Sequence, residues 1–164
     1  VNADPSARNG LFLSRRLDIM ADIFVANDFV ILESRAKQKL NLLRLSDLDF
    51  DPVGYVLIVH RPVAERDPDL VKRFTRATQR GFQYLLDSPK ESIALMTKLY
   101  GDRLGPEIIE GQVTRLLTLV NREPGLGVSS DGAWQRSLDL LHEAGVIDKK
   151  LPLPEYFTND FVQS

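Results

Sequence analysis

The sequence predicts an α/β fold, and two features of the chain lead to that prediction. Tyr55–Val59 is a run of apolar residues without alternation, which is typical of a strand covered on both faces. After Asp67 the apolar residues recur at helical spacing, and capping signals stand in front of the expected helices. Strand-type segments followed by several helices favour the α/β class.

The composition is that of an ordinary globular protein and excludes several kinds of function. The 164 residues carry a net charge of −2, whereas a nucleic-acid binder usually shows a basic excess. The chain has no Cys, which excludes a disulfide frame, a thiolate metal site and a Cys nucleophile. No apolar run reaches the roughly 20 residues that a membrane helix needs.

The first 60 residues are expected to alternate between helices and strands. The expected elements are a helix over 6–15, a buried strand over 18–25, a helix capped by Asn27 or Asp28, and strands over 41–45 and 55–60. The segment between the last two strands is rich in turn-forming residues. So few strands cannot build a complete doubly wound domain, which favours a partial chain.

Four helices and an irregular tail are expected after residue 66. The first is capped by Asp67, the second opens at Ser88–Glu91 and stops at Gly101, the third opens at Gly105-Pro106, and the fourth is capped by Asp131 and stops at Gly145. We expect these helices to pack together as one unit. Trp134 lies on an apolar helical stripe, so we interpret it as a core residue.

Few residue patterns in the chain point to catalysis or metal binding. Asp47, Asp49 and Asp51 have the spacing of half a calcium loop, but the glycine and the final acidic residue of such a loop are missing. We therefore interpret them as turn residues, placed where α/β proteins present ligand groups. His60 and His142 have no partner at metal-ligand spacing and are expected to be structural or surface residues. No catalytic residue, metal or cofactor is predicted.

Asp28 leaves two interpretations open. A carboxylate in front of a helix is often a cap. Alternatively, it accepts hydrogen bonds from the amino group of a ligand, a strong and selective contact because an unmatched ligand leaves the charge unsatisfied.

Several runs of this sequence, in order along the chain, resemble the NMT1/THI5-like group of ABC-transporter substrate-binding proteins. The runs are Leu13–Asp18, Leu45–Asp51, Asp67–Phe74, Arg76–Gly81 and Tyr156–Phe161. The group includes binding proteins for thiamine pyrimidine precursors, riboflavin, nitrate, sulfonates and taurine. The resemblance covers nearly all of the chain and corresponds to the C-terminal half of the family.

The resemblance implies a partial type II periplasmic binding protein fold, in which two α/β lobes clamp a ligand. Residues 1–45 would be the end of lobe two. Residues 46–164 would contain the hinge crossing and the C-terminal part of lobe one. Such a partial clamp is expected neither to catalyse a reaction nor to hold its ligand tightly. Apolar surface around Tyr55–Val59 and Phe74 would be left uncovered, which favours self-association.

The resemblance also implies which residues meet the ligand. The polar stretch after the lobe-two strand corresponds to Phe24, Asn27 and Asp28. The loop near the hinge corresponds to Asp49 and Phe50. Asp28 stands where pyrimidine-binding members more often have Glu, and Val53 stands where a Tyr is common. These departures from the family pattern weigh against a pyrimidine ligand.

By resemblance, the function would be capture of a small solute, a thiamine pyrimidine precursor or a similar heteroaromatic compound, for an ABC importer. The partner would be the transporter permease, and the location the periplasm or the outer face of the cell membrane. Contact with the membrane would come only through the transporter or through a lipid anchor outside this chain. Two alternatives stay open. One is a THI5-like synthase of the thiamine pyrimidine, and the other is a helical interaction module unrelated to transport.

Overall fold

The computed structural model describes residues 5–21, 23–36, 38–120, 122–123 and 125–162. The chain divides into two compact units, each built from two stretches of sequence. The first unit contains residues 1–42 and 84–120, and the second contains 43–83 and 121–164. The predicted division into parts of two lobes at residue 45 stays a prediction.

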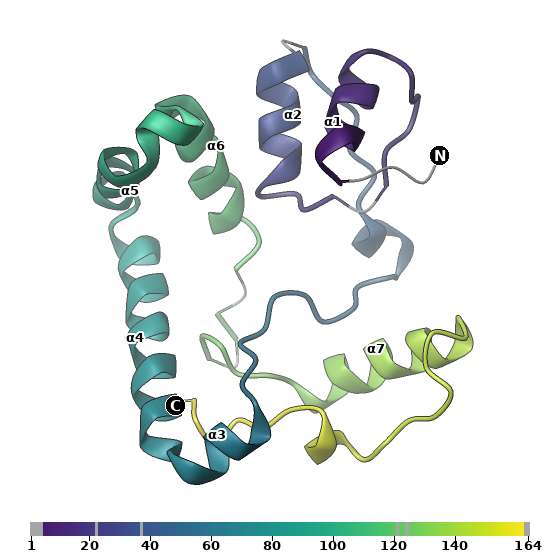
Figure 1. Cartoon of the computed structure of the whole chain (residues 1–164), viewed down its shortest axis with the longest axis vertical. Helices are drawn as coiled ribbons and strands as arrows, with labels where there is room; N and C mark the ends of the chain where they lie inside the picture. Colours follow the sequence, from purple (N-terminus) through teal and green to yellow (C-terminus); the bar gives the residue numbers. More distant parts are fainter. Residues whose placement is uncertain (1–4, 22, 37, 121, 124, 163–164) are drawn as a thin grey trace. The chain divides into compact units, whose positions relative to one another are not determined.

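The described residues form helices joined by irregular segments (Figure 1). The helices are α1 (Pro5–Leu13), α2 (Asp28–Ala36), α3 (Arg61–Arg66), α4 (Pro68–Asp87), α5 (Pro89–Leu104), α6 (Pro106–Leu117) and α7 (Asp131–Glu143), with short 3-10 helices η1 (Leu45–Leu48) and η2 (Leu153–Glu155).

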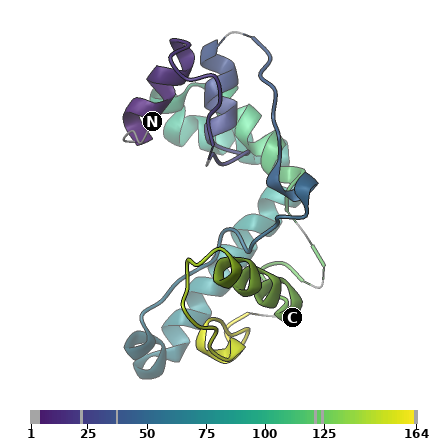
Figure 2. The same cartoon turned by 90° about the vertical axis from the view of Figure 1, so that its right-hand side faces the viewer.

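The first unit is held together by a small helical core. α5 packs against α6, α6 against α2, and α2 against α1 (Figure 2). The core side chains come from α2 and α6, namely Phe29, Leu32, Ile109 and Val113, which are at most 3% exposed. Burial of such side chains contributes about 1.5–3 kcal/mol each. The contact between α2 and α6 therefore contributes to the stability of this unit.

Gly111 lets α6 approach α2 closely. A Cβ atom at this position would lie 2.7 Å from Cγ1 of Val30. A residue larger than glycine would therefore require Val30 or one of the two helices to shift. On either side of this contact, Asn27 and Glu33 reach Gln112 and Arg115 of α6.

The second unit joins α7 to the C-terminal tail. α7 packs against η2, and Leu138 of α7 is 4% exposed. The ring of Trp134 stacks on that of Phe157, with centroids 5.1 Å apart and planes within 6°. This stack agrees with the packing role predicted for Trp134, and the partner of the indole comes from the tail.

The predicted α/β class is wrong for this structure, because the described residues form no strand. The described parts of 18–25 and the segments 41–44 and 51–60 are irregular, and Leu45 begins η1. A strand needs a neighbouring strand to receive its backbone hydrogen bonds, and apolar composition cannot supply one. No ladder is found among the described residues, so the partial type II binding-protein fold is not seen here. Residue 22, within the first expected strand, lies outside the described residues.

The helix predictions fare better, with corrections at the ends. Asp67 caps α4 as predicted, since its Oδ1 accepts from the amide of Leu70 at 2.9 Å. α5 runs through Gly101 to Leu104, because Gly105 with φ of 83° is the residue that leaves the helix. Ser130, not Asp131, caps α7 through its hydroxyl. Gly145 ends that helix with φ of 68°, as predicted.

The last four helices, which were expected to pack together as one unit, are divided between the two units. α5 and α6 pack together in the first unit, while α7 packs with η2 in the second. α4 leaves much of its apolar face uncovered, with Phe74 61% exposed. The expectation of uncovered apolar surface near Phe74 is met.

Candidate functional site

In the first unit, the predicted ligand residues form a closed turn in front of α2. The amide of Phe24 donates to Oδ2 of Asp28 at 2.9 Å, and the amide of Asn27 donates to the carbonyl of Phe24 at 3.0 Å. Asp28 is the first residue of α2, where the helix dipole favours a negative charge. The structure therefore brings these three residues together.

Among the described residues, the polar side chains of Asn27 and Asp28 use only part of their hydrogen-bonding capacity. Oδ1 of Asn27 accepts from Nε2 of Gln112 on α6 at 2.6 Å, which leaves the donor side of the Asn27 amide for another partner. A carboxylate accepts several hydrogen bonds, and the bond from Phe24 engages one oxygen of Asp28. The ring of Phe24 is 52% exposed. The turn thus presents an aromatic face, amide donors and a carboxylate together.

The neighbouring helix holds this turn in place. The guanidinium of Arg115 lies over the ring of Phe29 at 5.2 Å and 3.7 Å from Oε2 of Glu33. With the Gln112 bond, these contacts fix the start of α2 against α6. Sequence reasoning missed Gln112 and Arg115, because no local signal links α6 to a segment some 85 residues earlier.

In the second unit, Asp49 and Phe50 follow η1. Asp49 has φ of 58°, in the left-handed region that Asp tolerates better than most residues. The amide of Phe50 donates to the carbonyl of Leu45 at 3.1 Å, and Arg44 pairs with Asp47 at 2.7 Å. The bond from Arg44 raises the pKa of its own guanidinium. This segment is a turn, in agreement with the interpretation of the Asp residues.

Asp49 lines a cavity of about 200 Å³ in this unit. Its walls are Asp49, Asp51, Arg136, Asp139, Leu140 and Glu143. Four carboxylates therefore face a single guanidinium. The last four of these residues come from one face of α7, at spacings of three and four, which is the signal that sequence reasoning overlooked.

Lys150 moderates the charge of that cavity. Its Nζ lies 2.7 Å from Oδ1 of Asp139, and this hydrogen bond, with another from Gln135, lowers the pKa of the Asp139 carboxyl. The volume is below the roughly 300–1,000 Å³ of typical small-molecule pockets. By itself the cavity suits only a small or partly inserted group.

Metal binding finds no support in the part of the chain that the structure describes. No group of three or more His, Asp or Glu side chains there could hold a metal ion. His60 occupies the N-cap position of α3 without a side-chain capping bond, and His142 lies in the last turn of α7; both are exposed. These positions agree with the structural or surface roles predicted for the two histidines.

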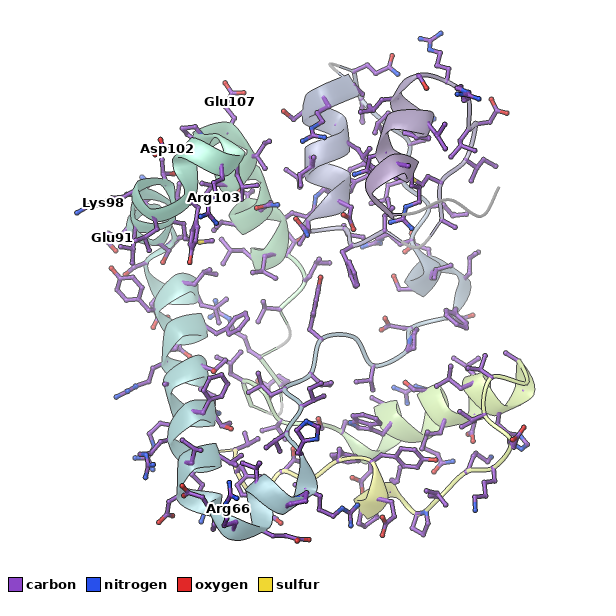
Figure 3. The ribbon with its side chains drawn as sticks, viewed as in Figure 1. Arg66, Glu91, Lys98, Asp102, Arg103 and Glu107 are labelled. Carbon is purple, nitrogen blue, oxygen red and sulfur yellow. The ribbon has the colours of Figure 1, made fainter. Side chains whose placement is uncertain are left out.

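A second cavity, of about 360 Å³, lies in the first unit and was not predicted. Ser34, Leu104, Gly105, Pro106, Glu107 and Ile108 line it. On α5 and α6, Figure 3 labels the exposed charged side chains Glu91, Lys98, Asp102, Arg103 and Glu107. Carboxylates and cations are mixed in this group, so it has the character of a solvated face rather than an anion-binding patch.

The tail Tyr156–Phe161 has a packing role in the structure. The amide of Ser129 donates to Oδ1 of Asn159 at 2.9 Å, and Nδ2 of Asn159 donates back to the carbonyl of Ser129 at 2.9 Å. The hydroxyl of Tyr156 accepts from the amide of Leu151. The two Asn159 bonds and the stack of Phe157 on Trp134 fasten the tail to the start of α7.

Comparison with known proteins gives the class of this chain. The family described as NMT1/THI5 like matches residues 3–92, and the chain belongs to that family. The resemblance inferred from the sequence is thereby confirmed.

One curated relative is similar over most of the chain. It is riboflavin-binding protein RibY of Chloroflexus aurantiacus, 25% identical over 130 residues. The match covers 76% of this chain but 37% of the relative, so the chain spans well under half of that protein's length. No solved structure matches. Within the described residues, no helix is long and apolar enough to cross a membrane.

Proposed function

We propose that this chain belongs to the solute-capturing component of an ABC importer and that its solute is a flat heteroaromatic compound of the flavin type. The observation that carries the proposal is the similarity, over 76% of the chain, to a protein named for binding riboflavin. Membership of the NMT1/THI5-like family supports the same class of function. A location outside the cytoplasm and a permease partner follow from the proposal.

The turn at the start of α2 is the proposed contact with the solute. An exposed aromatic ring at Phe24 can stack on a heteroaromatic ring system. The Asn27 amide and the Asp28 carboxylate can pair with polar edges of such a ring or with hydroxyl groups attached to it. Asp49 and Phe50, which the resemblance also implies as ligand residues, lie in the second unit and stay a separate prediction.

Flavin-type compounds are preferred over thiamine pyrimidine precursors on the strength of the relative's name. The synthase alternative has no comparable support, because the curated relative is a binding protein.

Riboflavin fluorescence provides the test. Titrating the chain into riboflavin should quench or polarise its emission, with a dissociation constant on the order of 10 μM to 1 mM, since a weak, open site is expected. A hydroxymethylpyrimidine, taurine and nitrate, added as competitors, should displace riboflavin poorly. If riboflavin emission does not respond up to about 1 mM protein, the proposed solute class is wrong. If a pyrimidine binds more tightly, the solute belongs to the precursor class instead.

The role of Asp28 is tested by replacing it with Asn, and the Asp69→Asn variant is the matched control. Asp69 is also an exposed Asp in the first turn of a helix, but it lies on α4 in the second unit. The Asp69→Asn variant should bind riboflavin with the same affinity as the unchanged chain.

A further inference from the structure

The segment Tyr55–Val59 exposes five consecutive apolar side chains. Tyr55 is 77% exposed and Ile58 90%, and the three residues between and after them are 45–55% exposed. Scattered single apolar residues are normal on a protein surface, but a contiguous apolar patch usually marks an interaction site. This segment therefore calls for an occupant.

The backbone of this segment offers hydrogen-bond donors along one edge. No turn or bend interrupts residues 51–60. The amide of Val53 donates to Oγ of Ser137 on α7 at 2.7 Å, so the edge that carries Val53 faces its own unit. In strand geometry, successive amides point to opposite edges. The other edge then carries the amides of Gly54, Val56, Ile58 and His60.

Proline and helix boundaries define the ends of that second edge. Pro52 lies on the same edge as Gly54 and Val56. Because it has no amide hydrogen, it ends the row of donors on the N-terminal side. On the other side, His60 occupies the N-cap position of α3 and Arg61 begins the helix. The residues from 53 to 59 carry no charge and are rich in β-branched side chains, a composition that favours strand pairing.

We propose that residues 52–60 pair antiparallel with the same residues of a second copy of this chain, with Val56 on the two-fold axis. In this register Tyr55 lies opposite Leu57, and Val53 opposite Val59. Both are apolar cross-strand pairs of the kind that stabilise a sheet. In the single chain the segment is no strand, so the ladder exists only between copies.

Charge complementarity favours this register over one centred on Leu57. It places Asp51 of each copy opposite Arg61 of the other, so two opposite-charge pairs flank the apolar centre. Moving the axis to Leu57 would set Arg61 opposite Val53 and lose both pairs. Arg61 now pairs with Glu155 at 3.0 Å, but both side chains are about half exposed or more. Such surface pairs contribute little, so Arg61 can exchange partners.

The dimer is expected to be weak, because a two-stranded ribbon alone is marginally stable in water. Light scattering or sedimentation over a concentration series should therefore show the mass rising from 18.5 kDa towards twice that value. A mass that stays monomeric up to about 1 mM would overturn the proposal. A continuous rise far beyond a dimer would show non-specific aggregation and would also overturn it.

Charge substitutions at the axis test the register directly. Val56→Lys and Val56→Glu each place like charges opposite one another, which should weaken the dimer by at least about tenfold. Mixing the two variants pairs Lys with Glu and should restore dimerisation. Ile19→Lys, at an 85% exposed apolar residue of the first unit, is the matched control and should dimerise normally. Unchanged dimerisation of Val56→Lys would refute pairing through this segment, and failure of the mixture would refute the register.

A pair of proline variants tests the edge. Val56→Pro removes a donor from the proposed pairing edge, whereas Leu57→Pro removes one from the opposite edge. The first should lower dimer affinity far more than the second. Helical circular dichroism equal to that of the unchanged chain would show that both variants fold. Equal loss in the two would contradict the assigned edge.

Discussion

Asn159 and Ser129 exchange two hydrogen bonds, so one side chain satisfies both backbone groups of a residue 30 positions earlier. The side-chain amide of Asn159 donates one hydrogen bond and accepts another, as the backbone of a neighbouring strand would. The next residue, Ser130, caps α7. The tail is therefore tied to the point where that helix begins.

Replacing Asn159 with Ala should lower the free energy of unfolding of the second unit by about 1–3 kcal/mol, because it leaves two partly buried backbone groups unpaired. Trp134, the only Trp of the chain, stacks on Phe157 of the same tail, so its fluorescence should report the loss during urea unfolding. Asn41→Ala, at an exposed Asn of the first unit, should leave that transition unchanged. A variant as stable as the unchanged chain would show that the two bonds contribute nothing.

Replacing Asp28 with Asn should weaken riboflavin binding by about 1.5–3 kcal/mol, the contribution of a hydrogen bond to a charged group. The fold should survive, since an Asn side-chain oxygen can still accept the bond from the amide of Phe24. Fluorescence titration of both proteins gives the difference. Unchanged affinity would assign Asp28 to shaping the turn alone.

Replacing Gly111 with Ala should destabilise the first unit by about 1–3 kcal/mol, because the added methyl meets Val30 at 2.7 Å. Val30→Ala in the same chain should recover part of this loss, which a double-mutant cycle measures by thermal unfolding. Gly81→Ala is the matched control. Nothing lies within 4 Å of its added Cβ, so it should stabilise α4 by about 0.5–1 kcal/mol. Destabilisation by both changes would point to helix backbone effects rather than to the contact with Val30.

Replacing Lys150 with Gln should raise the pKa of Asp139, because the hydrogen bond from Lys150 is the largest cause of its lowered value. Since the folded pKa is below the unfolded one, this pair stabilises the fold above the unfolded pKa, and its contribution is lost as pH falls through the folded pKa. Carboxyl NMR titration of the two proteins measures the change. Lys149→Gln should leave the Asp139 titration in place. A larger rise in the pKa of Asp139 in Lys149→Gln than in Lys150→Gln would contradict the assignment of Lys150 as its partner.

Signals confined to a few neighbouring residues predicted the helices well. Asp67-Pro68, Gly105-Pro106 and Gly145 mark helix ends by backbone and capping properties that act within a single turn. The strands failed because a strand depends on a partner elsewhere in the chain. Tyr55–Val59 has the composition of a strand, yet no partner strand for it is found among the described residues.

The candidate site was predictable only in part for the same reason. Phe24, Asn27 and Asp28 are near neighbours in sequence, and the family resemblance points to them together, but the local pattern indicated a strand rather than a turn at Phe24. The contacts of Asn27 with Gln112 and of Asp49 with the face of α7 join distant segments. Only the fold brings those residues together.

Gly105 alone separates α5 from α6, and this has a consequence for the order in which the chain folds. Contacts between residues close in sequence need little loop closure, so this helical hairpin should form early. The core pairs of α6 with α2 close a loop of some 80 residues and should form later. Pulse-labelling hydrogen exchange should then protect amides of α5 and α6 before those of α2. Protection of α2 first would reverse this order.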